Sequence, residues 1–226
     1  MNSLSSGFFL LKQNQKPDFG YTTGSCAAAA SCAASRMLIQ QKNVPYVFLQ
    51  TPSGITICLE VLNAVFTKDV AICAVKKDSG SDPDITNGVL VYATVKFCNE
   101  TGVFIKGGSG VGRITLPGLN QKVGEWAINS VPRDMIKKSV LNELKNISRG
   151  LSITLSIPEG KDLAYKTFNP RLGIVDGISV LGTTGIVRPM SLEAIIETIK
   201  IETNVRKEQG YTILPVVPGN YGLDFL

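Results

Sequence analysis

The residues best suited to chemistry lie in glycine-rich turns that also carry hydroxyl groups. The segment GISVLGTTGIV, residues 177–187, reads as the end of a buried strand followed by a tight turn. The turn contains Gly182, Thr183, Thr184 and Gly185, whose backbone N–H groups and hydroxyls could contact a nucleotide-like cofactor. Its spacing matches neither GxGxxG nor a P-loop, so a plain turn that needs glycine for a positive φ is the alternative.

A second segment of this kind, FGYTTGSCAAAAS, precedes an alanine-rich stretch near the start of the chain. Its small residues indicate a helix that packs very close to a sheet, with Thr23 or Ser25 as the N-cap. The first turn of such a helix has free backbone N–H groups, so the loop could also bind an anion. Thr22, Thr23 and Ser25 are therefore candidate ligand contacts.

Two charged loops complete the set of candidates. The segment KKDSGSDPDITNG, residues 76–88, is either an ordinary turn rich in Asp, Pro and Gly or a polar loop at the mouth of a ligand site. The segment KGGSGVGRITLPG, residues 106–118, could bring its backbone close to a ligand, with Arg113 holding a carboxylate by two hydrogen bonds. The alternative for this second loop is a flexible hairpin connection.

Composition excludes several kinds of active site. The chain of 226 residues contains no histidine, which removes Ser-His and Cys-His nucleophile pairs and makes a zinc site improbable, so no metal ligands are predicted. Its five cysteines form no CxxC pair and favour reduced, buried thiols in a cytoplasmic protein.

Charge and hydropathy narrow the choice of partners. The net charge of +5 comes from scattered basic residues, which suit a small polyanionic ligand or a plain solvated surface, and we expect no nucleic-acid partner. No apolar run approaches the roughly 18 residues that a membrane span needs, so we expect no membrane partner. The sequence leaves a homo-oligomer open.

The elements that must position these loops follow from hydrophobic periodicity. Helices are expected after the first hydroxyl loop and over residues 132–145. Strands are expected at residues 46–51, 55–61, 70–75, 89–97, 103–106 and 151–157. Because consecutive strands are joined by short turns, much of this sheet should be antiparallel, and residues 1–176 are expected to form an α+β domain.

The last part of the chain has a different pattern. A short apolar run at residues 177–181 precedes a helix over 192–209 with Ser191 as N-cap and with apolar residues on one face. A further apolar run lies at residues 211–217. Strand, glycine turn, helix and strand predict the start of a βαβ unit, so residues 177–226 are expected to open a smaller α/β domain.

Taken in order, the segments are more specific than any one of them. They are FGYTTGSCAAAAS, KKDSGSDPDITNG, GSGVGRITLPGL, GEWAINSVPRDMI, IPEGKDLAYKTFNPRLGIVDGISVLGTTGIVRPMS and PGNYG. This series closely resembles the CbiD family of cobalt-precorrin-5B (C1)-methyltransferases of anaerobic cobalamin biosynthesis. The resemblance runs from about Gly20 to Gly222 and is most specific over residues 167–191.

The resemblance implies transfer of a methyl group from S-adenosylmethionine to ring carbon C1 of a cobalt-containing corrin precursor. It places the turn from Gly182 to Gly185 at the junction of two domains, beside the cofactor. Because the precursor carries many carboxylates, basic residues become candidate clamps: Lys76, Lys77, Arg113, Arg133, Arg171 and Arg188. Asp82 or Asp84 would orient the substrate or take up a proton.

The chain also departs from the family pattern. Asn87 stands where family members usually have histidine, so any role of that histidine is in doubt here. Members continue well beyond the PGNYG motif, which predicts that the second domain is truncated, packed onto the first, or completed by another chain. Two alternatives to the methyltransferase therefore remain: a shortened, non-catalytic tetrapyrrole-binding or scaffold relative, and a sugar- or phosphate-binding enzyme that uses the loop Gly107–Gly112.

Overall fold

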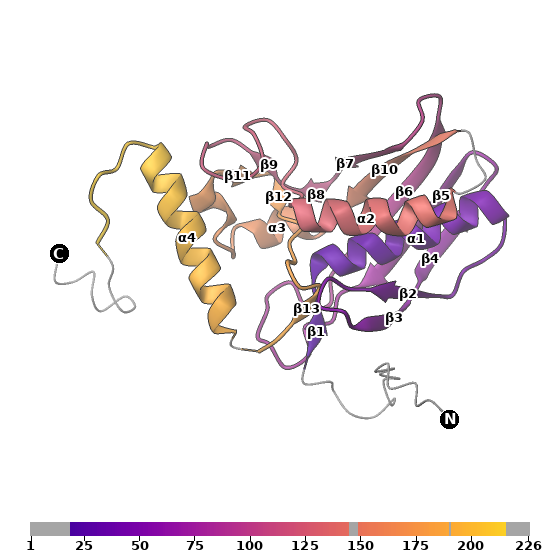
Figure 1. The fold of residues 1–226 in the computed structure, drawn as a ribbon, viewed down its shortest axis with the longest axis horizontal. Coiled ribbons are helices and arrows are strands. Elements are labelled where there is room, and N and C mark those ends of the chain that lie inside the picture. The colour runs from indigo at the N-terminus through magenta and orange to yellow at the C-terminus, as the bar shows by residue number, and fades with distance from the viewer. Residues whose placement is uncertain (1–18, 145–148, 190, 216–226) are drawn as a thin grey trace.

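The computed structural model describes residues 19–144, 149–189 and 191–215. Its centre is a five-stranded sheet with the strand order β4-β5-β6-β10-β7 (Figure 1). The strands are β4 (Leu62–Phe66), β5 (Val70–Lys76), β6 (Leu90–Cys98), β7 (Val103–Gly107) and β10 (Gly150–Ser156). All neighbours are antiparallel except β10 and β7, which run parallel. The expected, largely antiparallel sheet is therefore confirmed.

Side-chain alternation explains why these strands form. In β6 the residues Val91, Ala93 and Val95 are fully buried while their neighbours are only partly covered. In β10 the same holds for alternate apolar residues from Leu151 to Leu155. Because side chains of a strand point to opposite faces in turn, one face of the sheet becomes continuously apolar and must be covered.

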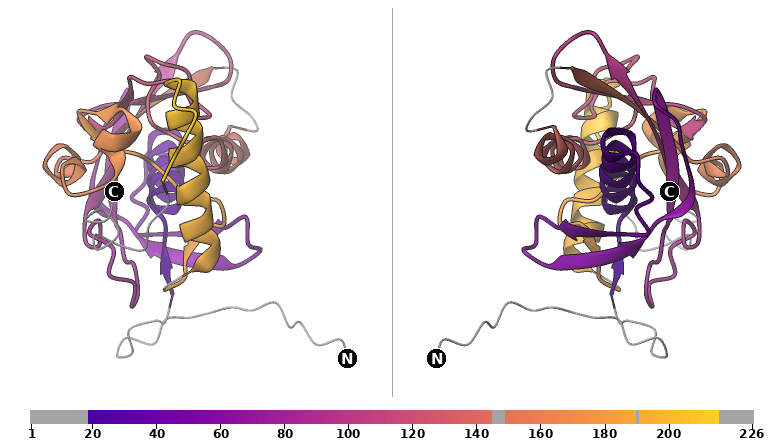
Figure 2. Two further views of the ribbon diagram at one scale, coloured as in Figure 1. Left: turned by 90° about the vertical axis from the view of Figure 1, so that its left-hand side faces the viewer. Right: turned by 90° about the vertical axis from the view of Figure 1, so that its right-hand side faces the viewer.

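The helix α1 (Thr23–Gln40) covers that face, packing on β5 and β6 and also against α2 (Ser130–Glu143) (Figure 2). Every residue from Thr23 to Ser35 is buried, so α1 has no solvated face along its first three turns. Alanine, serine, glycine and cysteine make this helix thin enough to lie between its neighbours. The prediction of a closely packed small-residue helix is confirmed.

Short strand pairs join distant parts of the chain. β2 (Tyr46–Gln50) and β3 (Thr56–Glu60) form a hairpin, and β1 (Gly20–Tyr21) pairs with β13 (Ile186–Val187). β8 (Gly110–Val111) pairs with β12 (Gly177–Ile178), and β9 (Arg113–Ile114) pairs with β11 (Ile174–Val175). The short helices α3 (Gly160–Ala164) and η1 (Asn169–Leu172) lie between β10 and β11 along the chain. Residues beyond 176 are thereby tied to the earlier part of the chain, and their assignment to a second domain stays a prediction.

The last helix, α4 (Leu192–Glu208), begins at its expected N-cap, where the Ser191 side chain accepts a hydrogen bond from Ala194 N. The four residues that we call the α4 apolar face are exposed by 44–66% of their surface: Leu192, Ile195, Ile196 and Ile199. The expected βαβ unit is wrong for the described residues, because 211–215 form no strand; residues 216 and 217 lie outside them. A strand needs a neighbour to pair with, and β12 is paired with β8, far from the end of α4 in Figure 1. No described helix is long and apolar enough to cross a membrane.

Candidate functional site

The turn Gly182–Gly185 lies against the N-terminus of α1. Backbone N–H groups of Thr22 and Gly24 donate to the carbonyls of Gly185 (3.2 Å) and Leu181 (2.8 Å). The buried hydroxyl of Ser25 also donates to the Gly185 carbonyl, at 2.6 Å. The two hydroxyl-rich segments found in the sequence are thus one structural unit, joined through β1 and β13.

The glycines of this turn are required by geometry. Gly182 and Gly185 have φ values of 142° and 79°, which other residues rarely adopt. A Cβ at Gly182 would overlap the Thr22 side chain, and one at Gly185 would lie 2.8 Å from Thr51 Cβ. The expectation of a turn with positive φ is confirmed. Between these glycines Thr183 and Thr184 are exposed, and their contact with a cofactor stays a prediction.

The N-cap of α1 is Thr22 and not Thr23 or Ser25, because the Thr22 side chain accepts from Ser25 N at 3.2 Å. The Thr23 hydroxyl instead bridges the backbone of Leu181, accepting from its N–H at 3.1 Å. Two first-turn donors, Gly24 N and Ser25 N, are therefore occupied within the chain. These contacts give Thr22, Thr23 and Ser25 a clear role in holding the turn, and the anion site expected here gains no support.

The loop from Lys77 to Val89 contains a buried ion pair. Lys77 Nζ donates to Asp84 Oδ2 at 2.6 Å and also to the Ser79 hydroxyl, and the side chains are 2% and 26% exposed. Asp84 Oδ1 accepts from both the N–H and the hydroxyl of Thr86, each at 2.7 Å. Burial raises the pKa of the Asp84 carboxyl. Hydrogen bonds from Lys77 and Thr86, together with the positive charge of Lys77, outweigh this effect and leave the pKa below its usual value.

This ion pair changes the expected roles of both residues. Asp84 is held ionised with its two oxygens engaged, which disfavours proton uptake from a substrate, and the ammonium of Lys77 is already neutralised. We infer that both residues fix the loop. The loop in turn holds β1: Tyr21 N donates to Asp78 O at 2.8 Å, and a Cβ at Gly80 would clash with the Phe19 backbone at 2.6 Å.

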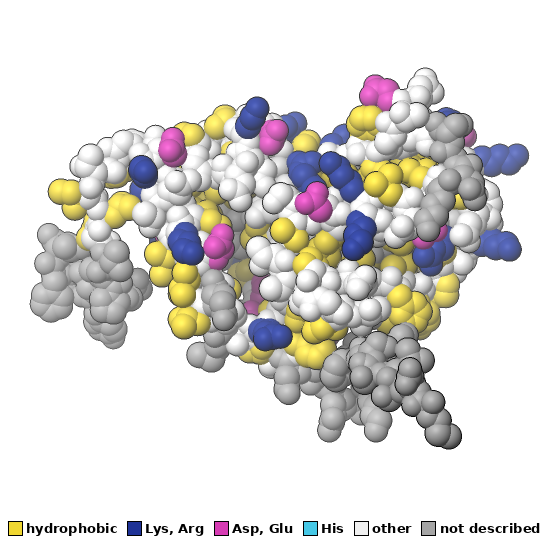
Figure 3. Space-filling model, viewed as in Figure 1, with side chains coloured by type: hydrophobic (Ala, Val, Ile, Leu, Met, Phe, Trp, Pro, Cys, Tyr) yellow, Lys and Arg dark blue, Asp and Glu magenta, His cyan; other side chains and the backbone are white. Residues whose placement is uncertain are grey.

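The remaining charged candidates are divided between two places. Lys76 and Arg188 are exposed and Asp82 half-buried, on segments that meet near β1 and β13. Arg113 lies on β9, which Figure 1 shows well separated from the strand pair of β1 and β13. Its guanidinium lies 3.7 Å from the centre of the Trp126 ring. Arg133 Nε donates to the Ile128 carbonyl at 2.9 Å, a structural contact. On the side of the molecule viewed in Figure 3, Lys and Arg side chains are spread out without one dominant patch.

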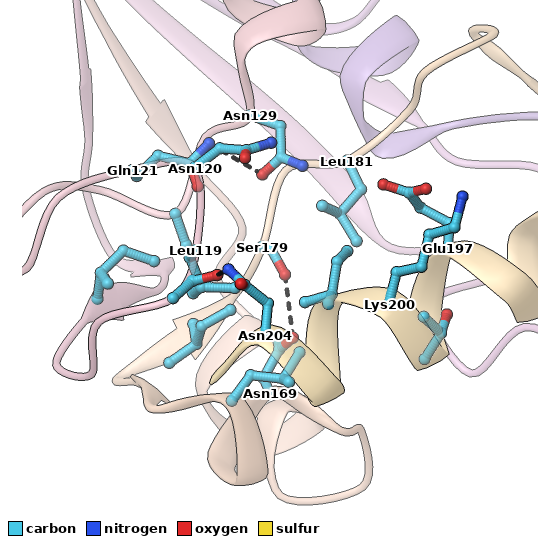
Figure 4. A pocket seen from close by; sticks show the side chains of 17 residues that line it. Leu119, Asn120, Gln121, Asn129, Asn169, Ser179, Leu181, Glu197, Lys200 and Asn204 are labelled. Carbon is cyan, nitrogen blue, oxygen red and sulfur yellow. Dashed lines mark hydrogen bonds between the residues drawn. The ribbon is translucent and has the colours of Figure 1, made fainter. Parts of the chain in front are cut away.

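Sequence reasoning missed a cavity of about 300 Å³ that lies between α4 and the loops before α2 and after η1. Figure 4 shows its polar side chains, which come from four segments of the chain. The residues that line it are Ile114, Gly118, Leu119, Asn120, Gln121, Ala127, Asn129, Asn169, Leu172, Ile174, Ser179, Leu181, Glu197, Thr198, Lys200, Ile201 and Asn204. Leu181 directly precedes the glycine turn, so the cavity and the turn adjoin. The Asn and Gln side chains of the cavity follow no spacing that marks a binding site in a sequence. The one sequence signal that could have pointed to them is that some lie in the segments that resemble the CbiD family.

The thiols are poor candidates for chemistry. Burial raises the pKa of Cys26 and Cys73 to about 12 and that of Cys32 to about 11, which keeps these thiols protonated. Cys58 and Cys98 are half-buried. No group of three metal-binding side chains occurs within the part of the chain that the structure describes.

Comparison with known proteins gives a consistent result. Residues 10–189 match the CbiD family. The chain is 46% identical over 219 residues to the cobalt-precorrin-5B C(1)-methyltransferase of Ruminiclostridium cellulolyticum, covering 96% of this chain and 57% of the relative. A protein of the same name from Clostridium perfringens (strain ATCC 13124) is 48% identical over 207 residues, covering 92% and 56%.

A solved structure is also similar. It is a cobalamin biosynthesis protein (cbiD) from Archaeoglobus fulgidus, with a TM-score of 0.59 and 34% identity over 81% of this chain and 58% of that one. The chain spans 57% and 59% of the length of the first two relatives that it matches.

Proposed function

This chain belongs to the CbiD family, and we propose on that premise that it acts in S-adenosylmethionine-dependent methylation of C1 of cobalt-precorrin-5B, a step of cobalamin biosynthesis. The observation that carries the proposal is 46% identity over 96% of the chain with a relative of that name. The aligned region covers 96% of the chain, and the glycine turn, the loop after β5 and the segments that line the cavity lie far enough from its ends to fall inside it.

The reaction demands alignment more than reactive side chains. S-adenosylmethionine supplies a methyl group already activated by a sulfonium, and the ring carbon displaces it in line as the C–S bond breaks. The chain must therefore bind both molecules face to face and exclude water between them. A chain without histidine and with protonated, buried thiols can meet this demand.

The donor fits the observed surroundings of the glycine turn. Thr183 is exposed, whereas the Thr184 hydroxyl is hydrogen-bonded to the backbone of Ile186; the adjoining cavity offers uncharged amides that can both donate and accept hydrogen bonds. The carbonyls of Gly185 and of Leu181, on either side of Gly182, are hydrogen-bonded to the N-terminus of α1 and keep the wall at Leu181 in place.

For the acidic substrate we keep the exposed cations as candidate clamps. Lys76 and Arg188 lie on segments beside the turn, and Arg113 and Arg171 are exposed elsewhere. Lys77 is withdrawn because Asp84 neutralises it. Asp82 stays the candidate for orienting the substrate or accepting its proton, since its side chain is half-buried and lies in the loop from Lys77 to Val89.

One observation favours the non-catalytic tetrapyrrole-binding alternative. Among the residues that the structure describes, nothing covers the α4 apolar face. A chain with an uncovered face could bind the corrin precursor without transferring a methyl group. Self-association, which would also cover the face, stays a prediction.

The test is a methyl-transfer assay with this chain, S-adenosylmethionine and cobalt-precorrin-5B, followed by mass spectrometry of the corrin. We expect the mass of one added methylene unit and a strong loss of turnover in Asp82→Asn. The matched control is Asp69→Asn, an exposed aspartate in the β4–β5 turn. Substrate binding without transfer would favour the alternative, and neither binding nor transfer by a folded chain would refute both.

A further inference from the structure

We propose that the cavity between α4 and the loop before α2 binds the methyl donor, with adenine at its amide wall and the amino-acid end at α4. This inference rests on the proposed function and assigns one of its two ligands. Figure 4 shows the two walls: Asn120, Gln121 and Asn129 on one side, and Glu197 and Lys200 on α4 on the other.

Size and charge select the donor over the corrin precursor. A volume of about 300 Å³ is at the lower end of the range for small-molecule pockets and too small for a corrin ring with its acid side chains. Among the lining residues Lys200 is the one cation, and the carboxylate of Glu197 stands beside it. A polyanionic ligand would meet a carboxylate here, whereas a zwitterionic amino acid would meet one charge of each sign.

The amide wall matches the hydrogen-bonding edge of adenine. Gln121 Nε2 donates to the Ile128 carbonyl and to Asn129 Oδ1, at 3.2 and 3.1 Å, which leaves Gln121 Oε1 to accept. The same contact engages Asn129 Oδ1 and leaves its NH₂ group to donate. An amide pair that both donates and accepts is the usual partner of adenine, which itself presents both kinds of group.

A hydrogen bond between two buried polar side chains lies at one end of the cavity. Asn169 and Ser179 are 8% and 7% exposed, and the Ser179 hydroxyl donates to Asn169 Oδ1 at 3.0 Å. That bond fixes the amide and leaves its NH₂ group as a donor. Buried polar side chains are costly unless their hydrogen bonds are satisfied, so a donor held beside a cavity points to a ligand acceptor.

The α4 wall supplies the charges that the amino-acid end needs. Glu197 and Lys200 are three residues apart, so they lie on one side of the helix. Neither forms an ion pair with any residue that the structure describes. Glu197 can pair with the ligand ammonium and Lys200 with its carboxylate.

The glycine turn then has a mechanical role toward this site. Leu181 lines the cavity, and its N–H and carbonyl are both hydrogen-bonded to the N-terminus of α1, through Thr23 and Gly24. These two hydrogen bonds keep the wall at Leu181 in position.

Calorimetric titration separates the two halves of the site, with S-adenosylhomocysteine and adenosine as probes. In Glu197→Gln and Lys200→Gln we expect affinity for S-adenosylhomocysteine to fall by about ten-fold, with adenosine binding unchanged. In Asn129→Ala both probes should bind about ten-fold more weakly. The matched controls are Glu208→Gln and Lys207→Gln, exposed residues of α4 outside the cavity, which should change neither affinity.

Two results would overturn the inference. S-adenosylhomocysteine binding that none of the cavity variants alters would place the donor elsewhere, while the methyl-transfer assay could still succeed. Absence of binding to the unaltered, folded chain would refute a donor site in this cavity, and the methyl-transfer assay would then decide the function separately. Circular dichroism of each variant checks the fold. If Asn129→Ala fails to fold, Glu197→Gln and Lys200→Gln still test the inference, because both residues are exposed on α4.

Discussion

The pair of Lys77 and Asp84 gives the sharpest test of the loop after β5. Replacing Asp84 by Asn leaves an ammonium that is 2% exposed without its counter-charge. Breaking a buried pair in this way costs about 3–5 kcal/mol of unfolding free energy. Because 26% of the Asp84 side chain reaches solvent, we expect the lower end, about 3 kcal/mol.

The reverse change should cost less. Lys77→Met leaves a carboxylate that is partly solvated and still accepts two hydrogen bonds from Thr86, so we expect a loss of about 1–2 kcal/mol. The double variant leaves no unpaired charge inside and should be more stable than Asp84→Asn alone. Urea unfolding of the four proteins closes the cycle.

The order of these effects can refute the reasoning. If Lys77→Met costs more than Asp84→Asn, or if both cost under about 1 kcal/mol, the pair does not hold the loop. Asp84→Asn that stays fully stable but loses methyl transfer would return Asp84 to the catalytic candidates. The lowered pKa of Asp84 adds a pH test: its contribution is complete above pH 3.8, its usual pKa, and is lost as pH falls through the lower folded-state value.

Three further predictions concern other parts of the molecule. Gly182→Ala should lower the unfolding free energy by about 2–4 kcal/mol, while Gly54→Ala, at a positive φ in open space, should cost about 1 kcal/mol in the same urea assay; equal costs would show that the clash with α1 is relieved. At pH 8, a thiol reagent should label Cys58 and Cys98 in the native chain and the three buried thiols only after unfolding; rapid labelling of all five would contradict their burial. Ile199→Glu should reduce the fluorescence of a bound apolar dye, because it removes part of the α4 apolar face; unchanged fluorescence would place the dye elsewhere.

Periodicity predicted the long elements and missed the short ones. The strands β5, β6 and β10 alternate clearly, and α1, α2 and α4 have capping or small-residue patterns, so each was located within a few residues. β4 was missed because its residues are partly exposed on both faces and its pairing with β5 is irregular. Two-residue strands such as β1 and β13 have no period, since their partner alone defines them.

The candidate site was predicted only in part for the same physical reason. Glycine and hydroxyl content marked the turn and the α1 loop, and the structure joins them. The burial of Lys77 depends on tertiary packing and could not be predicted from a charged loop in the sequence. The cavity combines Asn129, Asn169 and α4, which come together only in three dimensions.

The close backbone contacts around the glycine turn bear on how this family should be compared. Gly20 against Ser79, Gly80 against Phe19 and Gly182 against Thr22 leave no room for a Cβ on three segments that are far apart in the sequence. A library of all single substitutions, selected only for soluble expression, should therefore reject changes at these positions even in a chain that never meets a ligand. Glu197 and Lys200 should pass that selection freely and fail only one for cobalamin-dependent growth. If the glycines never change in either selection, this shows only that the backbone packs too closely for a side chain. The positions that tolerate substitution for soluble expression but not for growth would be those that contact the ligand.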